Sequence, residues 1–300
     1  MSLSVSPAVA AALEAGTPVV ALESTIISHG LPRPDNLGAA RRFEKILTDQ
    51  GVTPATIAVL DGVLKVGLTD AELKRIANED IAKLSVRDLP VALATRTSGA
   101  TTVAATSFIA ALAGVRVFAT GGLGGVHRNA SETFDESADL STLAQTAITV
   151  VSAGVKSILD IRATLERLET LSVTVLGYQT DEFPSFWLTA SGEKLDWLVP
   201  DAATVADVMA ANDQLGRRSA IILANPLAAD QQLDPAIHDK ALAEALRMAN
   251  ERGLSGKEVT PFLLSTMVDL TGGTSLAVNL LIAENNINVA AQIALAWSSR

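Results

Sequence analysis

The chain alternates short apolar runs with longer amphipathic stretches along most of its length. The apolar runs are rich in Val and Ile and lack a clear polar alternation, which is typical of strands covered by helices on both faces. We predict strands at Val19–Leu22, Thr56–Leu60, Val115–Ala119, Ile148–Ser152, Val173–Leu176 and Ala220–Leu223. Helical patterns lie between them at Asn36–Thr48, Thr102–Ala113, Ile161–Leu171 and Asp201–Leu215. This order predicts an α/β fold: a three-layer α/β/α sandwich with a largely parallel or mixed central sheet.

Local signals refine this outline. Thr69-Asp70-Ala71-Glu72 has the pattern of a capping box that opens a further helix. The stretch Asp61–Leu68 favours a small hairpin or a strand excursion instead. The last third, from Asp234, is mostly helical, with breaks around Gly253–Pro261 and at Thr271-Gly272-Gly273. Because no Ser/Pro/Gly-rich linker or repeat interrupts the pattern, we interpret residues 1–300 as one domain.

Composition narrows the range of functions. The 300 residues carry a formal net charge of −10, so the clustered Lys and Arg that nucleic-acid binding needs are lacking. There is no cysteine, which excludes disulfides and cysteine-ligated metal centres. No apolar run reaches the roughly 20 residues of a membrane helix, and the first residues lack the pattern of a signal peptide. We predict a cytoplasmic protein that binds neither nucleic acid nor membrane.

The candidate functional residues follow predicted strands. Ligands of open parallel sheets sit beyond the carboxyl ends of the strands, and Glu23, Thr120–His127 and Lys156 all occupy such positions. Lys156 leaves an apolar strand through a small-residue turn, where a helix should begin. A lysine there loses hydration, which favours the neutral amine that attacks a carbonyl carbon. The alternative is a lysine that merely extends from a helix start into solvent.

Glu23 and the glycine-rich segment 120–128 suggest further chemistry. Partial burial at the sheet edge would raise the pKa of Glu23 and suit it to general acid catalysis, whereas a helix cap or a loop ion pair is the structural alternative. The glycine-rich turn could close its backbone N–H groups around an anion. It matches neither G-x-G-x-x-G nor G-x-x-x-x-G-K-[ST], so dinucleotide and ATP binding are rejected.

A phosphate site is physically reasonable at Ser98–Thr102, which opens a small-residue helix. Lys83 could add a positive charge to the same phosphate. Ordinary capping by one hydroxyl is the alternative.

The segment 134–140 offers three carboxylates in five residues: Asp135, Glu136 and Asp139. Hard divalent cations such as Mg²⁺ or Mn²⁺ take oxygen ligands and keep several waters, although a solvated acidic loop would have the same sequence. Of the histidines, His29 is expected to line the opening near Glu23, and His238, on a late amphipathic helix, is expected at the surface.

Taken together, the chain resembles the pseudouridine-5′-phosphate glycosidase family. The similar stretches span nearly its whole length: Ala21–Pro32, Thr101–Thr106, Phe118–Arg128, Thr133–Asp135, Ser137–Leu140, Ala153–Asp160, Gly177–Pro184, Gly256–Leu264 and Thr271–Leu276. Asn129 stands where a small residue, often glycine, is more usual, and Thr95–Gly99 is less glycine-rich than is typical.

The resemblance implies cleavage of the carbon–carbon glycosidic bond of pseudouridine 5′-phosphate to uracil and ribose 5-phosphate, in a reversible reaction. It implies that Lys156 is the nucleophile, which forms a Schiff base on ring-opened ribose, and that Glu23 is the proton donor. It implies one Mn²⁺ per subunit at Asp135, with Asp139 as the other possible ligand, and a homotrimer. The substrate-binding residues that it implies are Lys83, Val103, Ser137, Ala138, Asp139, His127 and Asn279.

Two other functions fit parts of the pattern. A non-catalytic α/β protein that binds a phosphosugar or nucleotide would keep the phosphate loops but would not need Glu23 and Lys156 together. A metal-dependent phosphosugar hydrolase would need several inward carboxylates and no lysine. The presence of both Glu23 and Lys156 favours the glycosidase.

Overall fold

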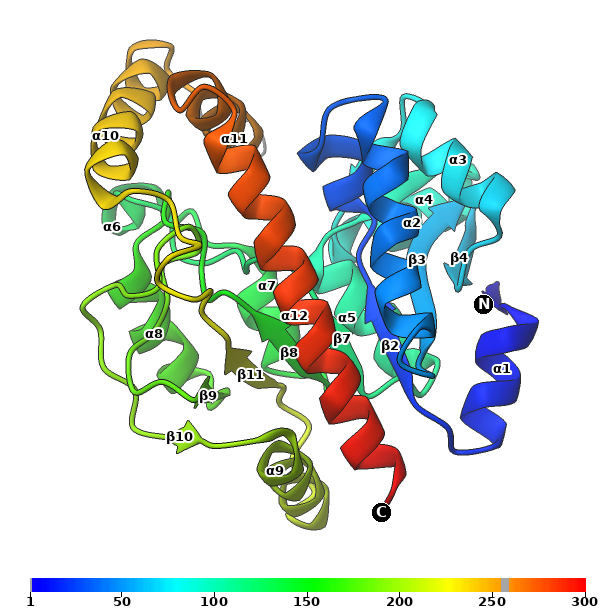
Figure 1. The fold of residues 1–300 in the computed structure, drawn as a ribbon. Coiled ribbons are helices and arrows are strands. Elements are labelled where there is room, and N and C mark those ends of the chain that lie inside the picture. The colour runs from blue at the N-terminus through cyan, green and yellow to red at the C-terminus, as the bar shows by residue number, and fades with distance from the viewer. Residues whose placement is uncertain (1, 255–258) are drawn as a thin grey trace.

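The computed structural model describes residues 2–254 and 259–300. Within these residues one mixed sheet runs in the order β1-β4-β3-β2-β7-β8-β11-β9-β10, and β6 joins β3 and β5 at its side (Figure 1). The strands are β1 (Leu3–Val5), β2 (Val19–Leu22), β3 (Thr53–Leu60), β4 (Val63–Val66), β5 (Ala82–Leu84), β6 (Gly99–Thr101), β7 (Val117–Ala119), β8 (Thr149–Ser152), β9 (Thr174–Tyr178), β10 (Leu198–Val199) and β11 (Ile221–Ala224). Only the pairings of β3 with β4 and β6 are antiparallel.

Helices cover both faces of the sheet, which gives the predicted three layers (Figure 1). They are α1 (Pro7–Glu14), α2 (Asp35–Thr48), α3 (Asp70–Asn78), α4 (Leu89–Thr95), α5 (Val103–Leu112), α6 (Ala130–Thr133), α7 (Ala138–Leu143), α8 (Ile161–Thr170), α9 (Ala202–Gln214), α10 (Pro235–Glu251), α11 (Val259–Leu270) and α12 (Thr274–Ser298), with a π-helical turn η1 (Ile26–Gly30) and a 3₁₀ turn η2 (Val86–Asp88). In the family-like stretch that begins at Gly256, the residues 256–258 lie outside the described part of the chain.

Alternate residues of the strands enter two different cores. In β2, Val19 and Ala21 pack with α1 and α5, whereas Val20 and Leu22 pack with α2, α9 and α12. All four are buried. Strands covered on both faces need apolar residues at every position, which explains why the sequence shows continuous runs instead of alternation.

The predicted fold class is confirmed, and all ten predicted strands and helices occur within a few residues of their predicted positions. The capping box at Thr69 and the hairpin of β3 and β4 are also confirmed. The prediction missed β1, β5, β6 and β10. These strands have two or three residues each and so carry no readable apolar run.

The carboxyl ends of β2, β7 and β8 meet at one edge, because β7 pairs in parallel with both of its neighbours. Two short strands bring a second set of residues to this edge. β5 runs parallel to β6, and the Ser24 hydroxyl after β2 ties the end of β6 in place by accepting from Thr101 N at 2.9 Å and donating to Ile57 O at 2.7 Å. The edge therefore gathers residues that lie far apart in the sequence.

The long helix α12 crosses one face of the sheet (Figure 1) and packs on β2, β7 and β8. Among the described residues, no single helix is long and apolar enough to cross a membrane. The pair α11–α12 meets that test of length and composition only when taken together, across a bend of 117°. Eleven side chains of α12 are buried, which accounts for its apolar sequence within the subunit itself.

Asn286, on α12, is a buried polar residue that ties this helix to the sheet edge. Its Nδ2 donates to Thr120 O at 2.7 Å and Gly121 O at 3.2 Å, and its Oδ1 accepts from Asn225 Nδ2 at 2.9 Å. It thereby supplies a donor to Thr120 O and a second donor to Gly121 O, which also accepts from Ala153 N at 2.9 Å.

We expect Asn286→Ala to lower the free energy of unfolding by about 2–4 kcal/mol, because it leaves several buried polar groups unpaired. Chemical denaturation measures the change. Asn288→Ala, on the exposed face of the same helix, is the control and should cost about 0.5 kcal/mol or less. Equal losses in the two variants would contradict the role given to Asn286.

Candidate functional site

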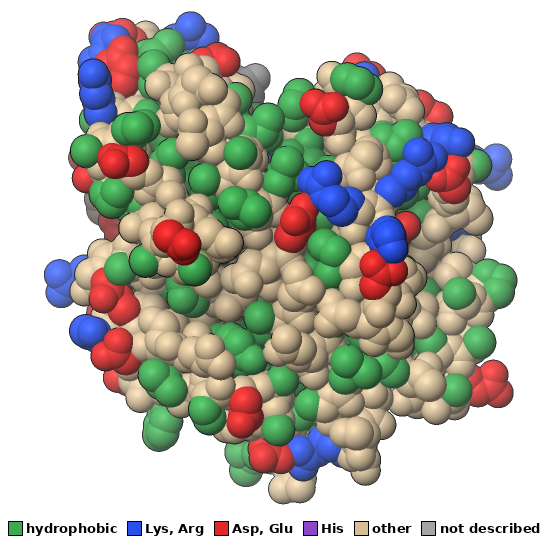
Figure 2. Space-filling view, viewed as in Figure 1, with side chains coloured by type: hydrophobic (Ala, Val, Ile, Leu, Met, Phe, Trp, Pro, Cys, Tyr) green, Lys and Arg blue, Asp and Glu red, His purple; other side chains and the backbone are tan. Residues whose placement is uncertain are grey.

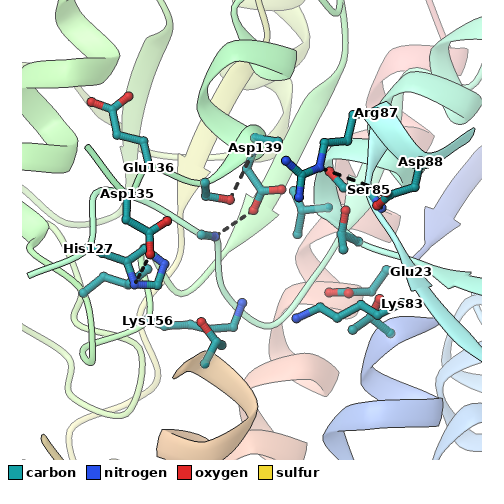
Figure 3. A pocket seen from close by; sticks show the side chains of 18 residues that line it. Glu23, Lys83, Ser85, Arg87, Asp88, His127, Asp135, Glu136, Asp139 and Lys156 are labelled. Carbon is teal, nitrogen blue, oxygen red and sulfur yellow. Dashed lines mark hydrogen bonds and ion pairs between the residues drawn. The ribbon is translucent and has the colours of Figure 1, made fainter. Parts of the chain in front are cut away.

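A cavity of about 290 Å³ lies at the carboxyl edge of the sheet. Figure 3 shows its side chains: Glu23, Lys83 and Lys156 lie on one side, with Asp135 and Asp139 across from them. A smaller chamber of about 90 Å³ adjoins it and shares Glu23, Thr25, Lys83, Lys156 and Thr260. Other walls of this chamber come from η1 and α11, and Figure 2 shows the surface notched between the parts of the molecule that carry these elements.

Glu23 directly follows β2 and faces both chambers. Its carboxylate accepts a short hydrogen bond from the Thr120 hydroxyl, from the end of β7. Burial raises the pKa of Glu23; the positive charge of Lys156 and the bond from Thr120 oppose this shift without cancelling it. A carboxyl group in this setting is able to hold a proton and to donate it, as the sequence predicted.

Lys156 reaches the same space from the turn after β8. Its Nζ donates to Gly122 O at 2.6 Å, and its backbone N donates to Leu123 O at 3.2 Å. The expected helix start at Lys156 is wrong: α8 begins at Ile161, and Asp160 caps it by accepting from Ala163 N at 2.9 Å. Lys156 therefore sits in an irregular turn, which is free to direct its side chain into the cavity.

Two further cations line the large chamber. Lys83 lies on β5, and in Figure 3 its ammonium group points to the same space as that of Lys156. Arg87, on η2, stands higher on the wall in this view and was missed by the sequence analysis. The only available signal was its position four residues after Lys83, in a stretch without apolar periodicity.

The structure divides the predicted phosphate turn. Thr102 and Val103 line the large chamber at the start of α5, where Thr102 caps the helix by accepting from Ala105 N at 3.4 Å. Ser98 lies at the opposite end of β6 and binds Asp61, so its place in the phosphate site is wrong. Because the three-residue strand β6 separates Ser98 from Thr102, the two cannot act as one loop.

The glycine-rich segment also differs from its prediction, because its carbonyl groups bind protein donors. Gly122 O accepts from Lys156, and Thr120 O and Gly121 O accept from Asn286. A Cβ on Gly124 would lie 2.3 Å from Ser137 Oγ, so only glycine lets this loop approach α7. The loop therefore holds site residues in place through its carbonyl groups. The sequence had predicted instead that its N–H groups would surround an anion.

Asp139, on α7, is buried and accepts two backbone hydrogen bonds. Its Oδ1 accepts from Ala104 N at 2.9 Å, and its Oδ2 accepts from Gly124 N at 2.8 Å. These bonds lock the start of α5 to the glycine-rich loop. Ser137 caps α7, and both Ser137 and Ala138 line the large chamber.

Asp135 and His127 lie side by side in the large chamber, with 3.7 Å between Oδ2 and Nδ1 (Figure 3). Burial lowers the pKa of His127, Asp135 opposes this shift, and Lys83 adds to it. The segment between them bends sharply at Asn129, which adopts a φ of 65°. Glycine and Asn accept that conformation most easily, which explains why this departure from the family pattern is tolerated.

The three predicted carboxylates do not form one cluster. Glu136 pairs with Arg167 at 2.9 Å and points away from the other two in Figure 3. Asp139 uses both oxygens on backbone N–H groups, which leaves Asp135 as the carboxylate best placed for a cation. Over residues 2–254 and 259–300, no group of three or more His, Asp or Glu side chains could hold a metal ion. The described residues therefore fit only a cation that keeps most of its ligands as water.

The small chamber has mostly apolar walls, including Ile26, Leu31, Phe186 and Leu264. Asn279 also lines it, and the Oδ1 atom of this residue is buried with no hydrogen-bond partner in the described part of the chain. His29 lies here, as expected, and burial is the main cause that lowers its pKa. An apolar slot with one unpaired acceptor suits a flat ring with an N–H group.

The expectation for His238 is wrong. Its side chain is buried, with Ser157 Oγ 2.8 Å from Nε2 and Asp239 Oδ1 2.9 Å from Nδ1. The sequence pattern correctly assigned His238 to a helix, α10. It could not show that the turn after β8 covers the face of this helix that carries His238.

Comparisons with known proteins agree over nearly the whole chain. Residues 8–296 match the family model described as Indigoidine synthase A like protein. The pseudouridine-5′-phosphate glycosidase of Frankia alni is 62% identical over 99% of this chain and 82% of its own, and that of Salinispora tropica is 60% identical over 97% and 91%.

Two solved structures share the fold. The prealnumycin C-glycosynthase AlnA, in complex with ribulose 5-phosphate, superposes with a TM-score of 0.92 at 38% identity and covers 100% of this chain and 98% of its own. An indigoidine synthase A-like protein from Thermotoga maritima has a TM-score of 0.91 at 32% identity, over 99% and 97%.

The raised pKa of Glu23 makes the stability of the protein depend on pH in a predictable way. The folded state binds this proton more tightly than the unfolded chain, whose carboxyl titrates near 4.5, so ionisation opposes folding as the pH rises above that value. Glu23→Gln should therefore be more stable than the wild type at about pH 8, and the difference should shrink as the pH falls to about 4. Denaturation at several pH values measures it, with the exposed Glu132→Gln as control. A difference that grows toward low pH would contradict the burial argument.

Proposed function

The chain belongs to the indigoidine synthase A-like family, and from this premise we propose that it cleaves pseudouridine 5′-phosphate to uracil and ribose 5-phosphate, reversibly. The observation that carries the proposal is the presence of a buried carboxyl group with a raised pKa, Glu23, and an inward amine, Lys156, in one cavity. The relatives with 60–62% identity are named for this activity.

The large chamber holds the ribose phosphate in this proposal. Lys83 and Arg87 bring positive charge to it, and the N-terminal turn of α5 adds backbone N–H groups at Val103. Ser137, Ala138, Asp139 and His127 line the same space and complete the substrate contacts. The related C-glycosynthase was solved with ribulose 5-phosphate, a phosphosugar of the same size, which supports this assignment.

The reaction needs an amine and an acid together. We propose that the neutral amine of Lys156 bonds to C1′ while the ribose ring opens, with the C1′–O4′ electron pair going to the ring oxygen. A proton then passes from the lysine nitrogen to that oxygen, which restores the nitrogen lone pair. Glu23 then protonates the uracil ring at C5, which turns a poor carbon leaving group into a good one. The lone pair of the Lys156 nitrogen forms an iminium with C1′, and the C1′–C5 electron pair returns to the uracil ring. Water then hydrolyses the Schiff base to ribose 5-phosphate, and Lys156 is regenerated.

The small chamber receives the uracil ring in this scheme. Its apolar walls contact the faces of the ring, and Asn279 offers its unpaired Oδ1 to a ring N–H. Since Glu23 and Lys156 line both chambers, the bond between sugar and base would lie beside both groups.

We further propose that the site binds Mn²⁺, because the oxygen donors present suit this cation. Asp135 would hold it through one carboxylate, with waters as the other ligands and His127 beside it. A bound Mn²⁺ would supply positive charge next to the sugar phosphate chamber. Asp139 is the weaker candidate, because its oxygens already accept Ala104 N and Gly124 N.

A homotrimer and a cytoplasmic location also remain proposals. The long helix α12 buries eleven side chains within the subunit, so its apolar sequence does not by itself require assembly. Exposed apolar side chains that a subunit contact could cover lie on two helices: Phe108 and Leu112 on α5, each 41% exposed, and Leu281 and Leu295 on α12, each 40% exposed.

The alternatives fit the site less well. A non-catalytic phosphosugar-binding protein has no use for a buried carboxyl group with a raised pKa beside an inward lysine. A metal-dependent phosphosugar hydrolase needs several converging carboxylates, and the acidic side chains of 135–139 have separate partners.

The direct test is to incubate the protein with pseudouridine 5′-phosphate and Mn²⁺, separate the products, and measure free uracil by its ultraviolet absorbance. Lys156→Ala should abolish release without unfolding the protein, because a lysine at the mouth of the cavity fills no core space. Borohydride with ribose 5-phosphate should add the mass of the reduced sugar to the peptide that contains Lys156.

Lys194→Ala is the control, since Lys194 is exposed and lines neither chamber. Absence of uracil release by the wild type would overturn the proposed function. Labelling of Lys83 in place of Lys156 would overturn the assignment of the nucleophile.

The metal proposal predicts that a chelator stops uracil release and that added Mn²⁺ restores it. Asp135→Ala should raise the Mn²⁺ concentration needed for half-maximal activity, because the one direct protein ligand is lost. Glu136→Ala should leave that concentration unchanged, since Glu136 pairs with Arg167. Full activity of the wild type in chelator would count against the proposal.

A further inference from the structure

Behind the Lys156 turn lies a chain of three polar side chains that the proposed reaction does not use: Ser157 and His238 are buried, and Asp239 lies at the surface. Ser157 and His238 are 2% and 3% exposed, and the Ser157 hydroxyl lies 2.8 Å from His238 Nε2. The other ring nitrogen, Nδ1, lies 2.9 Å from Asp239 Oδ1. A carboxylate can only accept, so Nδ1 carries a proton, and we assign Nε2 as the acceptor of the Ser157 hydroxyl.

This arrangement has the order of a Ser-His-Asp triad, but the hydroxyl is not available for attack. Ser157 lines neither of the two chambers at the sheet edge. It stands with His238 and Asp239 in the wall of a further cavity of about 360 Å³, but its exposure of 2% leaves the hydroxyl almost no access to that space. Its partner His238 packs against the buried Trp187, with ring centroids 6.1 Å apart. The chain is therefore a structural connection from α10 to the residue next to Lys156.

The turn at 154–160 belongs to no helix or named strand, and isolated bridges at Gly154, Val155 and Asp160 join it to its neighbours. On the side of the glycine-rich loop, Lys156 N donates to Leu123 O at 3.2 Å, and Arg128 Nη2 donates to Ser157 O at 3.1 Å. On the opposite side, among the described residues, His238 is the one hydrogen-bond partner of the Ser157 side chain.

Reaction removes a restraint from Lys156 itself. Its Nζ now donates to Gly122 O at 2.6 Å, and it must leave this acceptor to bond to a carbon atom. From that point only the backbone of the turn fixes where the amine stands. A shift of about 1 Å at an attacking atom can cost roughly 100-fold in rate.

We propose that His238 is a positioning residue for Lys156: through the Ser157 hydroxyl it holds the turn that aims the amine at C1′. The inference rests on the proposed function for the identity of the attacked carbon. The Asp234 cap at the start of α10, which accepts from Ala236 N and Ile237 N, sets the first helical turn on which His238 stands.

The test compares four variants by kinetics of uracil release. His238→Leu removes the acceptor but keeps bulk, and kcat should fall roughly 10- to 100-fold while KM changes less than about twofold, because the phosphate is held elsewhere. His238→Gln keeps an acceptor and should retain most of kcat. Ser157→Ala should lower kcat like His238→Leu, and combining the two should add little, because they remove the same bond.

The matched control is Ala249→Gly, a buried position of α10 far along the helix from Ser157. It destabilises the helix through backbone entropy without touching the hydrogen-bond chain. If kcat falls as much in this control as in His238→Leu, or if His238→Leu lowers only the melting temperature, then His238 is merely structural and the inference fails.

A second readout does not depend on the proposed function. Reductive methylation with formaldehyde and cyanoborohydride, followed by peptide mass spectrometry, compares Lys156 with the exposed Lys194. In His238→Leu the ratio of Lys156 to Lys194 modification should rise about 2- to 10-fold, as expected for loss of one hydrogen bond. A wild type that releases no uracil would overturn the function alone. An unchanged methylation ratio would overturn the positioning role.

Discussion

Burial of one carboxyl group beside one amine is the interaction on which the site depends. Glu23 stands at the end of β2, between the larger and the smaller chamber, where loss of hydration favours its protonated form. The positive charge of Lys156 lowers the pKa of Glu23 and so opposes the effect of burial. A change at either residue would therefore alter the protonation of Glu23. Parallel pairing of β2, β7 and β8 creates this meeting, because it brings the ends of three distant segments to one edge.

The rest of the site keeps these two groups in place without satisfying them fully. Carbonyl groups of the glycine-rich loop accept hydrogen bonds from Lys156 and Asn286. Asp139 connects that loop to α5 by accepting from one backbone N–H group of each. Such contacts hold the walls in place, while the Oδ1 atom of Asn279, in the wall of the small chamber, has no hydrogen-bond partner among the described residues. Preformed walls with a few unpaired groups are what a binding site needs before its ligand arrives.

The sequence predicted the parts of this site that follow uninterrupted apolar runs. Glu23 and Lys156 could be placed because a parallel sheet puts the residues after its strands at a single edge. Arg87 and the true position of Ser98 could not be placed, because β5 and β6 are three residues long and their pairing depends on β3. His238 was misplaced for a related reason: helix periodicity gives a face, but it does not show which irregular turn will cover that face.

The central claim is that the two residues have separate roles: Glu23 donates the proton to uracil, and Lys156 forms the covalent bond to C1′. The most direct measurement is the kinetics of Glu23→Gln with pseudouridine 5′-phosphate, together with borohydride trapping of ribose 5-phosphate on the same variant. The account predicts that kcat falls roughly 10²- to 10⁴-fold, while KM and trapping at Lys156 stay near the wild-type values. Near-normal turnover, or loss of trapping along with turnover, would contradict it.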